Sequence, residues 1–165
     1  MLRSSLSIAV VWVLVCALIY WAFDALILRQ HNPNQMQIGM TQQADLILKR
    51  SRDGHFRMSA TLNGEPVVLL IDTGASVLTI DQSLAKQLSL PEGAQLMTQT
   101  ANGEVAAYES KLDTLIFGPF QMREVKVAVV RKLGNEVLLG MNVLRRFSVQ
   151  IAGDEMKLQL LKEGR

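Results

Sequence analysis

The stretch that most constrains the fold lies near the middle of the chain. Residues 67–71 are five apolar residues in a row, a pattern typical of a short strand buried on both faces. The run ends at Asp72, whose carboxylate is costly to bury unless it is hydrogen-bonded or paired. Thr73 adds a hydroxyl, and Gly74 permits a turn tight enough for backbone groups to approach the carboxylate. The stretch is interpreted as a strand that presents an acid, although a plain turn would also explain the triplet.

Charge and cysteine content argue against several classes of function. The 165 residues include 17 Lys and Arg against 15 Asp and Glu, and no more than two basic residues follow one another. This balance predicts no nucleic-acid partner. Cys16 is the only cysteine, so no intrachain disulfide can form, and His31 and His55 lie far apart without a Cys partner. We therefore expect no metal site and no cofactor.

An apolar N-terminal run predicts one transmembrane helix. Every residue from 6 to 23 except Ser7 is apolar or aromatic. At about 1.5 Å per residue this run is about 27 Å long, close to the thickness of the hydrocarbon core of a bilayer. We assign residues 1–29 to an uncleaved anchor. A secretory signal peptide is the alternative, since Arg3 supplies a basic start, but no clear Ala-x-Ala cleavage site follows.

The remaining chain divides into a linker and one globular domain. Residues 30–43 are polar and Gln-rich and are assigned to a linker, with an ordered loop packed on the domain as the alternative. In the domain, residues 44–165, short apolar or alternating stretches are separated by turn signals such as Asn63-Gly64. Short helices are expected only at 81–88, capped by Asp81, and at 141–147. This pattern predicts an all-β barrel rather than an α/β fold.

Two motifs in this order resemble the retropepsin-like (retroviral-type) aspartic proteases. They are Leu-Ile-Asp-Thr-Gly-Ala-Ser at 70–76 and Leu-Leu-Gly-Met-Asn-Val-Leu at 138–144. The resemblance is closest to bacterial members with one N-terminal membrane helix, and it covers about residues 45–162. It implies a small acid-protease barrel with one or two short helices. The chain departs from the retroviral pattern at Ser76, where an acidic residue is common, and at Met141, where an Arg is common.

The resemblance also implies roles for individual residues. Asp72, Thr73 and Gly74 would form the catalytic loop, with Asp72 supplying the carboxylate. Residues 100–103 fall where the family has its flap hairpin, although the tip is not Gly-rich. The residues expected to bind substrate are Ala75, Ser76, Ala101, Asn102, Gly103, Leu139 and Gly140.

A single catalytic aspartate predicts that two chains build the active site. Aspartic protease chemistry uses two carboxylates that share a proton and a water. Asp113 lacks the following Gly, Asp81 is better explained as a helix cap, and Asp154 lies in an evident turn. The second carboxylate is therefore expected from Asp72 of another copy, in a two-fold homodimer.

These observations predict a membrane-anchored aspartic endopeptidase that cleaves polypeptides. The resemblance and the basic residue Arg3 favour the bacterial inner membrane, with a cytoplasmic N-terminus and a periplasmic protease domain, although Arg29 on the other side weakens the assignment of orientation. One alternative is a non-catalytic retropepsin-like module that binds extended peptides at the membrane surface. Another is a structural module whose barrel only positions the helix.

Overall fold

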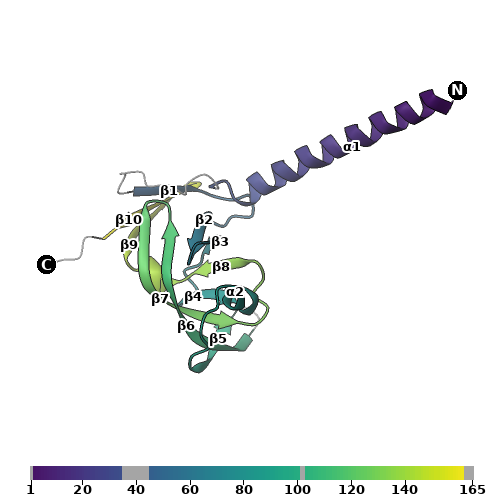
Figure 1. The fold of residues 1–165 in the computed structure, drawn as a ribbon. Helices are drawn as coiled ribbons and strands as arrows, with labels where there is room; N and C mark the ends of the chain where they lie inside the picture. Colours follow the sequence, from purple (N-terminus) through teal and green to yellow (C-terminus); the bar gives the residue numbers. More distant parts are fainter. Residues whose placement is uncertain (1, 35–44, 101–102, 162–165) are drawn as a thin grey trace.

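The computed structural model describes residues 2–34, 45–100 and 103–161 (Figure 1). One long helix, α1 (Leu2–His31), projects from a small β-rich body that contains the short helices α2 (Gln82–Gln87) and α3 (Met141–Leu144). The strands are β1 (Asp45–Lys49), β2 (Arg57–Leu62), β3 (Glu65–Ile71), β4 (Leu78–Asp81), β5 (Gln95–Thr100), β6 (Gly103–Phe117), β7 (Phe120–Val130), β8 (Glu136–Leu139), β9 (Phe147–Ala152) and β10 (Glu155–Leu160).

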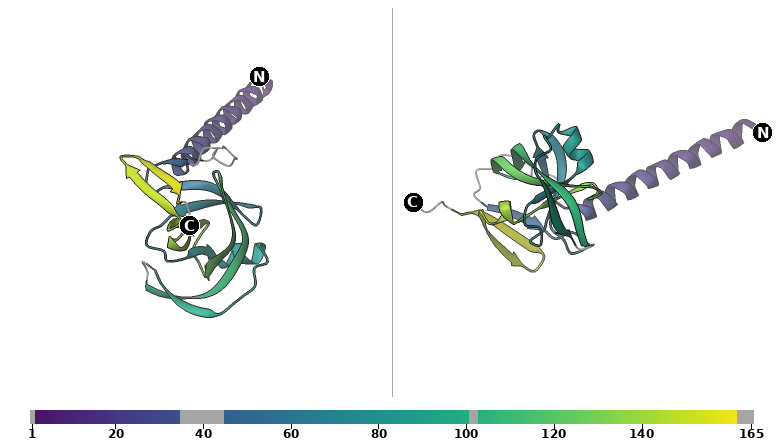
Figure 2. Two further views of the ribbon diagram at one scale, coloured as in Figure 1. Left: turned by 90° about the vertical axis from the view of Figure 1, so that its left-hand side faces the viewer. Right: turned by 90° about the horizontal axis from the view of Figure 1, so that it is seen from below.

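The strands form two sheets. The 3-stranded sheet has the order β1-β10-β9, and the 7-stranded sheet has the order β2-β3-β8-β4-β7-β6-β5. Strand β2 also pairs with β6, from Ala60 opposite Phe117 to Leu62 opposite Leu115. This extra pairing joins distant strands of the larger sheet and curls it into a barrel, which Figure 2 shows from two further sides. The predicted all-β barrel with short helices is confirmed.

Two pairs of strands in the larger sheet run parallel. Strand β3 runs parallel to β8, with Ile71 opposite Leu139, and β4 runs parallel to β7, with Leu78 opposite Val127. Because β3 and β8 end side by side, the residues that follow them are brought together. Those residues are Asp72 and Gly140, one from each motif.

A continuous apolar core joins the two sheets. Leu48 and Leu158 from the smaller sheet are fully buried in the same cluster as Leu69 and Leu115 from the larger one. The prediction that residues 67–71 are buried on both faces is wrong. Only Leu69 and Ile71 are buried, because alternate side chains of a strand point to opposite faces and the outer face of β3 stays partly open among the described residues.

Local turn and cap signals are confirmed. Asn63 and Gly64 both have positive φ, at 48° and 90°, as the tight two-residue turn between β2 and β3 requires. The Asp81 carboxylate accepts a hydrogen bond of 2.8 Å from the backbone N–H of Ser83 at the start of α2. The sequence therefore located these two connections from neighbouring residues alone.

Helix α1 continues to His31, two residues beyond the predicted end of the anchor, and its large apolar side chains over 8–28 are exposed. The stretch Ser7–His31 is long and apolar enough to cross a membrane by length and composition. Asn32 and Asn34 fall within the predicted linker and are buried against the domain. For these residues the alternative of an ordered packed loop describes the structure, and residues 35–43 of the predicted linker lie outside the described chain.

Candidate active site

Asp72 lies in a loop that β8 holds in place. Its backbone N–H donates to the carbonyl of Leu139 over 3.2 Å. The N–H of Gly74 donates to a carboxylate oxygen of Asp72 over 2.8 Å, and the N–H of Ala75 donates to the Asp72 carbonyl over 3.3 Å. The Asp72 side chain is half-buried. The loop therefore binds the carboxylate through a backbone donor and leaves part of it open.

Gly140 lets the loop and the chain after β8 pass in direct contact. A Cβ atom at this position would lie 2.5 Å from the carbonyl carbon and oxygen of Val77 and 2.8 Å from the carbonyl oxygen of Ala75. The N–H of Met141 donates to the Ala75 carbonyl over 2.8 Å, and the N–H of Asn142 donates to the Ser76 carbonyl over 3.0 Å. Only glycine can occupy the crossing without displacing the backbone around Asp72.

Asn142 is a supporting residue to which the sequence analysis assigned no role. Its Oδ1 accepts a hydrogen bond of 2.8 Å from the N–H of Leu78, and its Nδ2 donates to the carbonyl of Lys126 over 2.9 Å. These bonds tie α3 to β4 and β7. The available signal was a lone amide in the second motif, between Met141 and Val143.

A cleft of about 960 Å³ opens beside Asp72. One wall is the loop itself, with Gly74, Ala75 and Ser76, and the other walls come from β4, β6, β7 and the chain around β5. The other apolar lining residues are Val77, Pro91, Ala94, Leu96, Val127, Ala128, Val130, Leu133 and Leu138. In addition to Asp72, the charged lining residues are Glu109, Lys111 and Lys126. A mostly apolar cleft with one aspartate, Asp72, at its edge suits an extended polypeptide with apolar side chains.

The structure brings some of the predicted substrate-binding residues together and separates others. Ala75 and Ser76 line the cleft. Leu139 and Gly140 are buried, whereas Leu138 lines the cleft, because successive residues of β8 point to opposite sides. The role of Leu139 in the site is its carbonyl, which accepts the hydrogen bond from Asp72.

The predicted flap belongs to the β5–β6 hairpin. Thr100 pairs with Gly103, which has a φ of 104° and begins β6. The two predicted residues between them, Ala101 and Asn102, lie outside the described chain. Leu96 and Thr98 of β5 line the cleft, so this hairpin forms one of its walls.

Among the described residues, Asp72 is the one aspartate that lines the cleft. Asp81 is occupied as a helix cap, and hydrogen bonds from Ser83 lower the pKa of its carboxyl group. Asp113 is exposed on β6, and Asp154 pairs with Arg50 at a distance of 3.4 Å. No group of three or more potential metal-ligating His, Cys, Asp or Glu side chains occurs in the described ranges.

Comparison with known proteins places this loop and cleft in a family. Residues 58–146, more than half of the chain, match a family model described as "gag-polyprotein putative aspartyl protease". The chain belongs to the retropepsin-like aspartic protease family. The region of this retropepsin-like chain that matches the family contains both the Asp72 loop and the Gly140 crossing, and α1 lies outside it.

One solved structure agrees with this assignment, and two similar curated proteins are uncharacterized. A crystal structure of a retropepsin-like aspartic protease from Rickettsia conorii shares 28% identity with a TM-score of 0.58, over 70% of this chain and 90% of that one. An uncharacterized protein in the cobV 5′ region of a Sinorhizobium species is 30% identical, over 71% of this chain and 52% of that protein. An uncharacterized protein of Rickettsia prowazekii is 34% identical, over 65% of this chain and 47% of that protein. The chain thus spans about half the length of the curated relatives it matches.

Proposed function

We propose that the protein is a membrane-anchored aspartic endopeptidase in which two copies of Asp72, one from each chain of a homodimer, activate a water molecule. The observation that carries this proposal is the half-buried Asp72 carboxylate, bound by the N–H of Gly74 at the edge of a peptide-sized cleft. Membership of the retropepsin-like family supports the same chemistry.

The proposed reaction divides the work between the two carboxylates. The ionised Asp72 takes a proton from the water while the water oxygen attacks the scissile carbonyl carbon. The protonated Asp72 of the second copy donates a hydrogen bond to the carbonyl oxygen, where negative charge develops. A proton then passes to the peptide nitrogen, and the C–N bond breaks. The two carboxylates share one proton because like charges a few ångströms apart cannot both ionise easily.

Exposed groups at the Asp72 loop and on β9 support the homodimer. Thr73 and Gly74 are exposed beside Asp72 in the single chain, where a second loop could pack. Val149 and Ile151 of β9 are 38% and 56% exposed, although they pair with residues of β10, Leu158 and Met156, that are buried. Directly paired residues lie on the same sheet face, so β9 carries an apolar surface that a second copy would cover.

The proposed location is the bacterial inner membrane, crossed once by α1, with the protease domain in the periplasm. The apolar, exposed stretch Ser7–His31 supports the anchor, although a secretory signal has the same length and composition. The comparisons that name bacterial relatives are consistent with a bacterial membrane. Intact-mass measurement of the membrane fraction tests the anchor, since a cleaved signal would remove most of α1.

The test compares full-length protein in lipid nanodiscs with the near-isosteric variant Asp72→Asn. Asp113→Asn is the matched control, because Asp113 is an exposed aspartate away from the cleft. Each protein is incubated with an unfolded protein substrate across acidic to neutral pH, and the cut sites are identified by mass spectrometry. We expect the wild type and the control to cleave and Asp72→Asn to be inactive. Equal cleavage by all three would assign the activity to a contaminant.

Mixing the wild type with Asp72→Asn tests the shared site. If one active site needs an intact Asp72 from each chain, an equal mixture of freely exchanging copies retains about one quarter of the wild-type activity. A site complete in one chain would retain about one half, and that result would exclude the homodimeric mechanism. A dimeric wild-type protein that binds peptides without cutting them would favour the non-catalytic module instead.

A further inference from the structure

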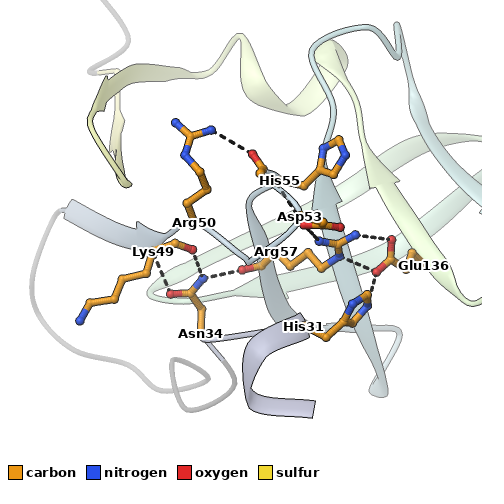
Figure 3. Close-up of polar contacts among 9 residues, drawn as sticks. His31, Asn34, Lys49, Arg50, Asp53, His55, Arg57 and Glu136 are labelled. Atoms are coloured by element: carbon orange, nitrogen blue, oxygen red, sulfur yellow. Dashed lines mark hydrogen bonds and ion pairs between the residues drawn. The ribbon is translucent and has the colours of Figure 1, made fainter. Parts of the chain in front are cut away.

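The end of α1 is fastened to the domain by a buried amide (Figure 3). Nδ2 of Asn34 donates to the carbonyls of Lys49 over 3.0 Å and of Arg57 over 2.7 Å, and Oδ1 accepts from the N–H of Lys49 over 3.0 Å. Asn34 is only 3% exposed. Its amide therefore joins the end of β1 to the start of β2 in the way a short piece of strand would.

Asn32 connects Asn34 to the end of the helix. Its backbone N–H donates to the carbonyl of Leu28 over 3.0 Å, which continues the last turn of α1. Its Oδ1 accepts from the N–H of Asn34 over 3.2 Å, and its Nδ2 donates to Oγ of Ser59 over 3.2 Å. The helix therefore runs directly into the residues that dock on β1 and β2.

Charged side chains hold the last turn of α1 from a second direction. Nε2 of His31 lies 2.7 Å from a carboxylate oxygen of Glu136, and Nε of Arg57 donates to the same oxygen over 2.6 Å. Arg57 is 5% exposed and also donates to Asp53 over 2.7 Å (Figure 3). Two carboxylate partners fix the position of this buried arginine, because its charge would be uncompensated without them. We call His31, Asn32 and Asn34 the helix-end clamp.

The helix-end clamp is joined to the candidate active site by rigid strands. Glu136 begins β8 and pairs with Val68 of β3, and the two strands run in parallel to Ile71 and Leu139. At about 3.3 Å per residue, Asp72 lies about 13 Å along β3 from the pair that contacts the clamp. Figures 1 and 2 show α1 leaving the body on the side away from the β5–β6 hairpin.

We propose that the helix-end clamp holds the cleft at a fixed height and orientation above the membrane, so that the enzyme cuts polypeptide segments within a narrow distance of the bilayer. The substrate part of this inference rests on the proposed function. A free linker over 30–43 would give the domain a reach on the order of 20 Å. The contacts of Asn32 and Asn34 remove that freedom, because they bind the domain immediately after the helix ends.

Inserting the same sequence at two positions distinguishes a rigid clamp from a flexible tether. Gly-Gly-Ser-Gly-Gly-Ser between His31 and Asn32, combined with His31→Ala, detaches α1 from the docked asparagines and from Glu136 and leaves the asparagines on the domain. The matched control carries the same His31→Ala substitution with the insertion between Gly39 and Met40, after the clamp. A tether would be lengthened equally by both insertions, whereas the clamp predicts that only the first frees the helix.

The first readout is a distance that needs no enzymatic activity. Spin labels are placed at the native Cys16 of α1 and at Gln150→Cys, an exposed position on β9. Full-length protein is diluted into an excess of unlabelled Cys16→Ser protein in nanodiscs, so that distances within one chain are measured. We expect a narrow distribution for the parent and for the 39/40 insertion, and a broad one for the 31/32 insertion. Equally broad distributions in all three would overturn the clamp.

The second readout is the position of the cuts in a membrane substrate. A single-pass reporter with a long unfolded segment outside the bilayer is reconstituted with each protein, and its cut sites are identified by mass spectrometry. Cuts should fall within a few residues of one position for the parent and the control, and spread along the segment for the 31/32 insertion. The same spread for all three would refute the fixed height. Cleavage of a soluble unfolded peptide tests the proposed function separately, because the rate of this cleavage should not change with either insertion.

Discussion

Gly140→Ala tests whether the crossing beside Asp72 supports both the fold and the reaction. The added Cβ would lie 2.5 Å from the backbone of Val77, whereas ordinary contacts begin at 3.4 Å. The two segments must therefore separate by about 0.9 Å, the difference between these distances. The backbone hydrogen bond from Met141 to Ala75, now 2.8 Å, would lengthen to about 3.7 Å, beyond hydrogen-bonding distance.

The expected losses follow from these displacements. Two backbone hydrogen bonds that join the crossing to the loop contribute about 0.5–1.5 kcal/mol each, and forcing a methyl group into packed backbone costs about 1–3 kcal/mol. The free energy of unfolding should therefore fall by about 2–6 kcal/mol. Since Asp72 belongs to the displaced loop, a shift of about 1 Å in the reacting groups should lower kcat by about 100-fold.

Gly153→Ala is the matched control for this prediction. Gly153 has a φ of 57°, and a Cβ there would meet no atom within 4 Å. The change should cost about 1–2 kcal/mol through backbone strain, without altering kcat. The assays are urea unfolding followed by circular dichroism and steady-state cleavage of a peptide. A Gly140→Ala protein with kcat within twofold of the wild type and nearly unchanged stability would refute the reasoning.

Three further predictions concern the supports of the fold. Asn142→Leu should lower the free energy of unfolding by about 2 kcal/mol in urea titrations, because two backbone groups of β4 and β7 lose their partner. Asn34→Ala should cost about 2–4 kcal/mol by losing hydrogen bonds to three backbone groups of β1 and β2, and should speed amide exchange in β1; unchanged exchange would contradict this. Hydrogen bonding to Arg57 holds the pKa of Asp53 well below its usual value of 3.8, so this carboxylate stabilises the fold above that value. This contribution is lost as the pH falls from about 5 through the folded pKa, and stability of Asp53→Asn should depend less on pH over that range.

Features that depend on neighbouring residues were predictable from the sequence. Asn63-Gly64 forms its turn because these two residues adopt positive φ at low cost, and Asp81 caps α2 because its partner, Ser83, is two residues away. The Asp72 loop was identified because a buried strand, an acid and a glycine follow one another directly. The second motif marked Gly140, although the backbone contact that requires glycine is visible only in three dimensions.

The choice between neighbouring residues at the site depended on strand orientation. Leu138 and Leu139 are identical in type, and the sequence analysis selected Leu139 as a substrate-binding residue. The pairing of β8 with both β3 and β4 decides that Leu138 faces the cleft and Leu139 the core. Asn142 was overlooked for a different reason, because its partners Leu78 and Lys126 are distant in sequence.

The sequence by itself determined the acid, its tight loop, the β-rich fold and the apolar helix, because each is encoded by adjacent residues. The tertiary structure alone decided how the helix meets the domain. Asn32 and Asn34 lie in a polar stretch typical of a linker, and the partners that order them belong to β1 and β2. His31 contacts Glu136 across 105 positions of the chain, and only folding brings those side chains within hydrogen-bonding distance.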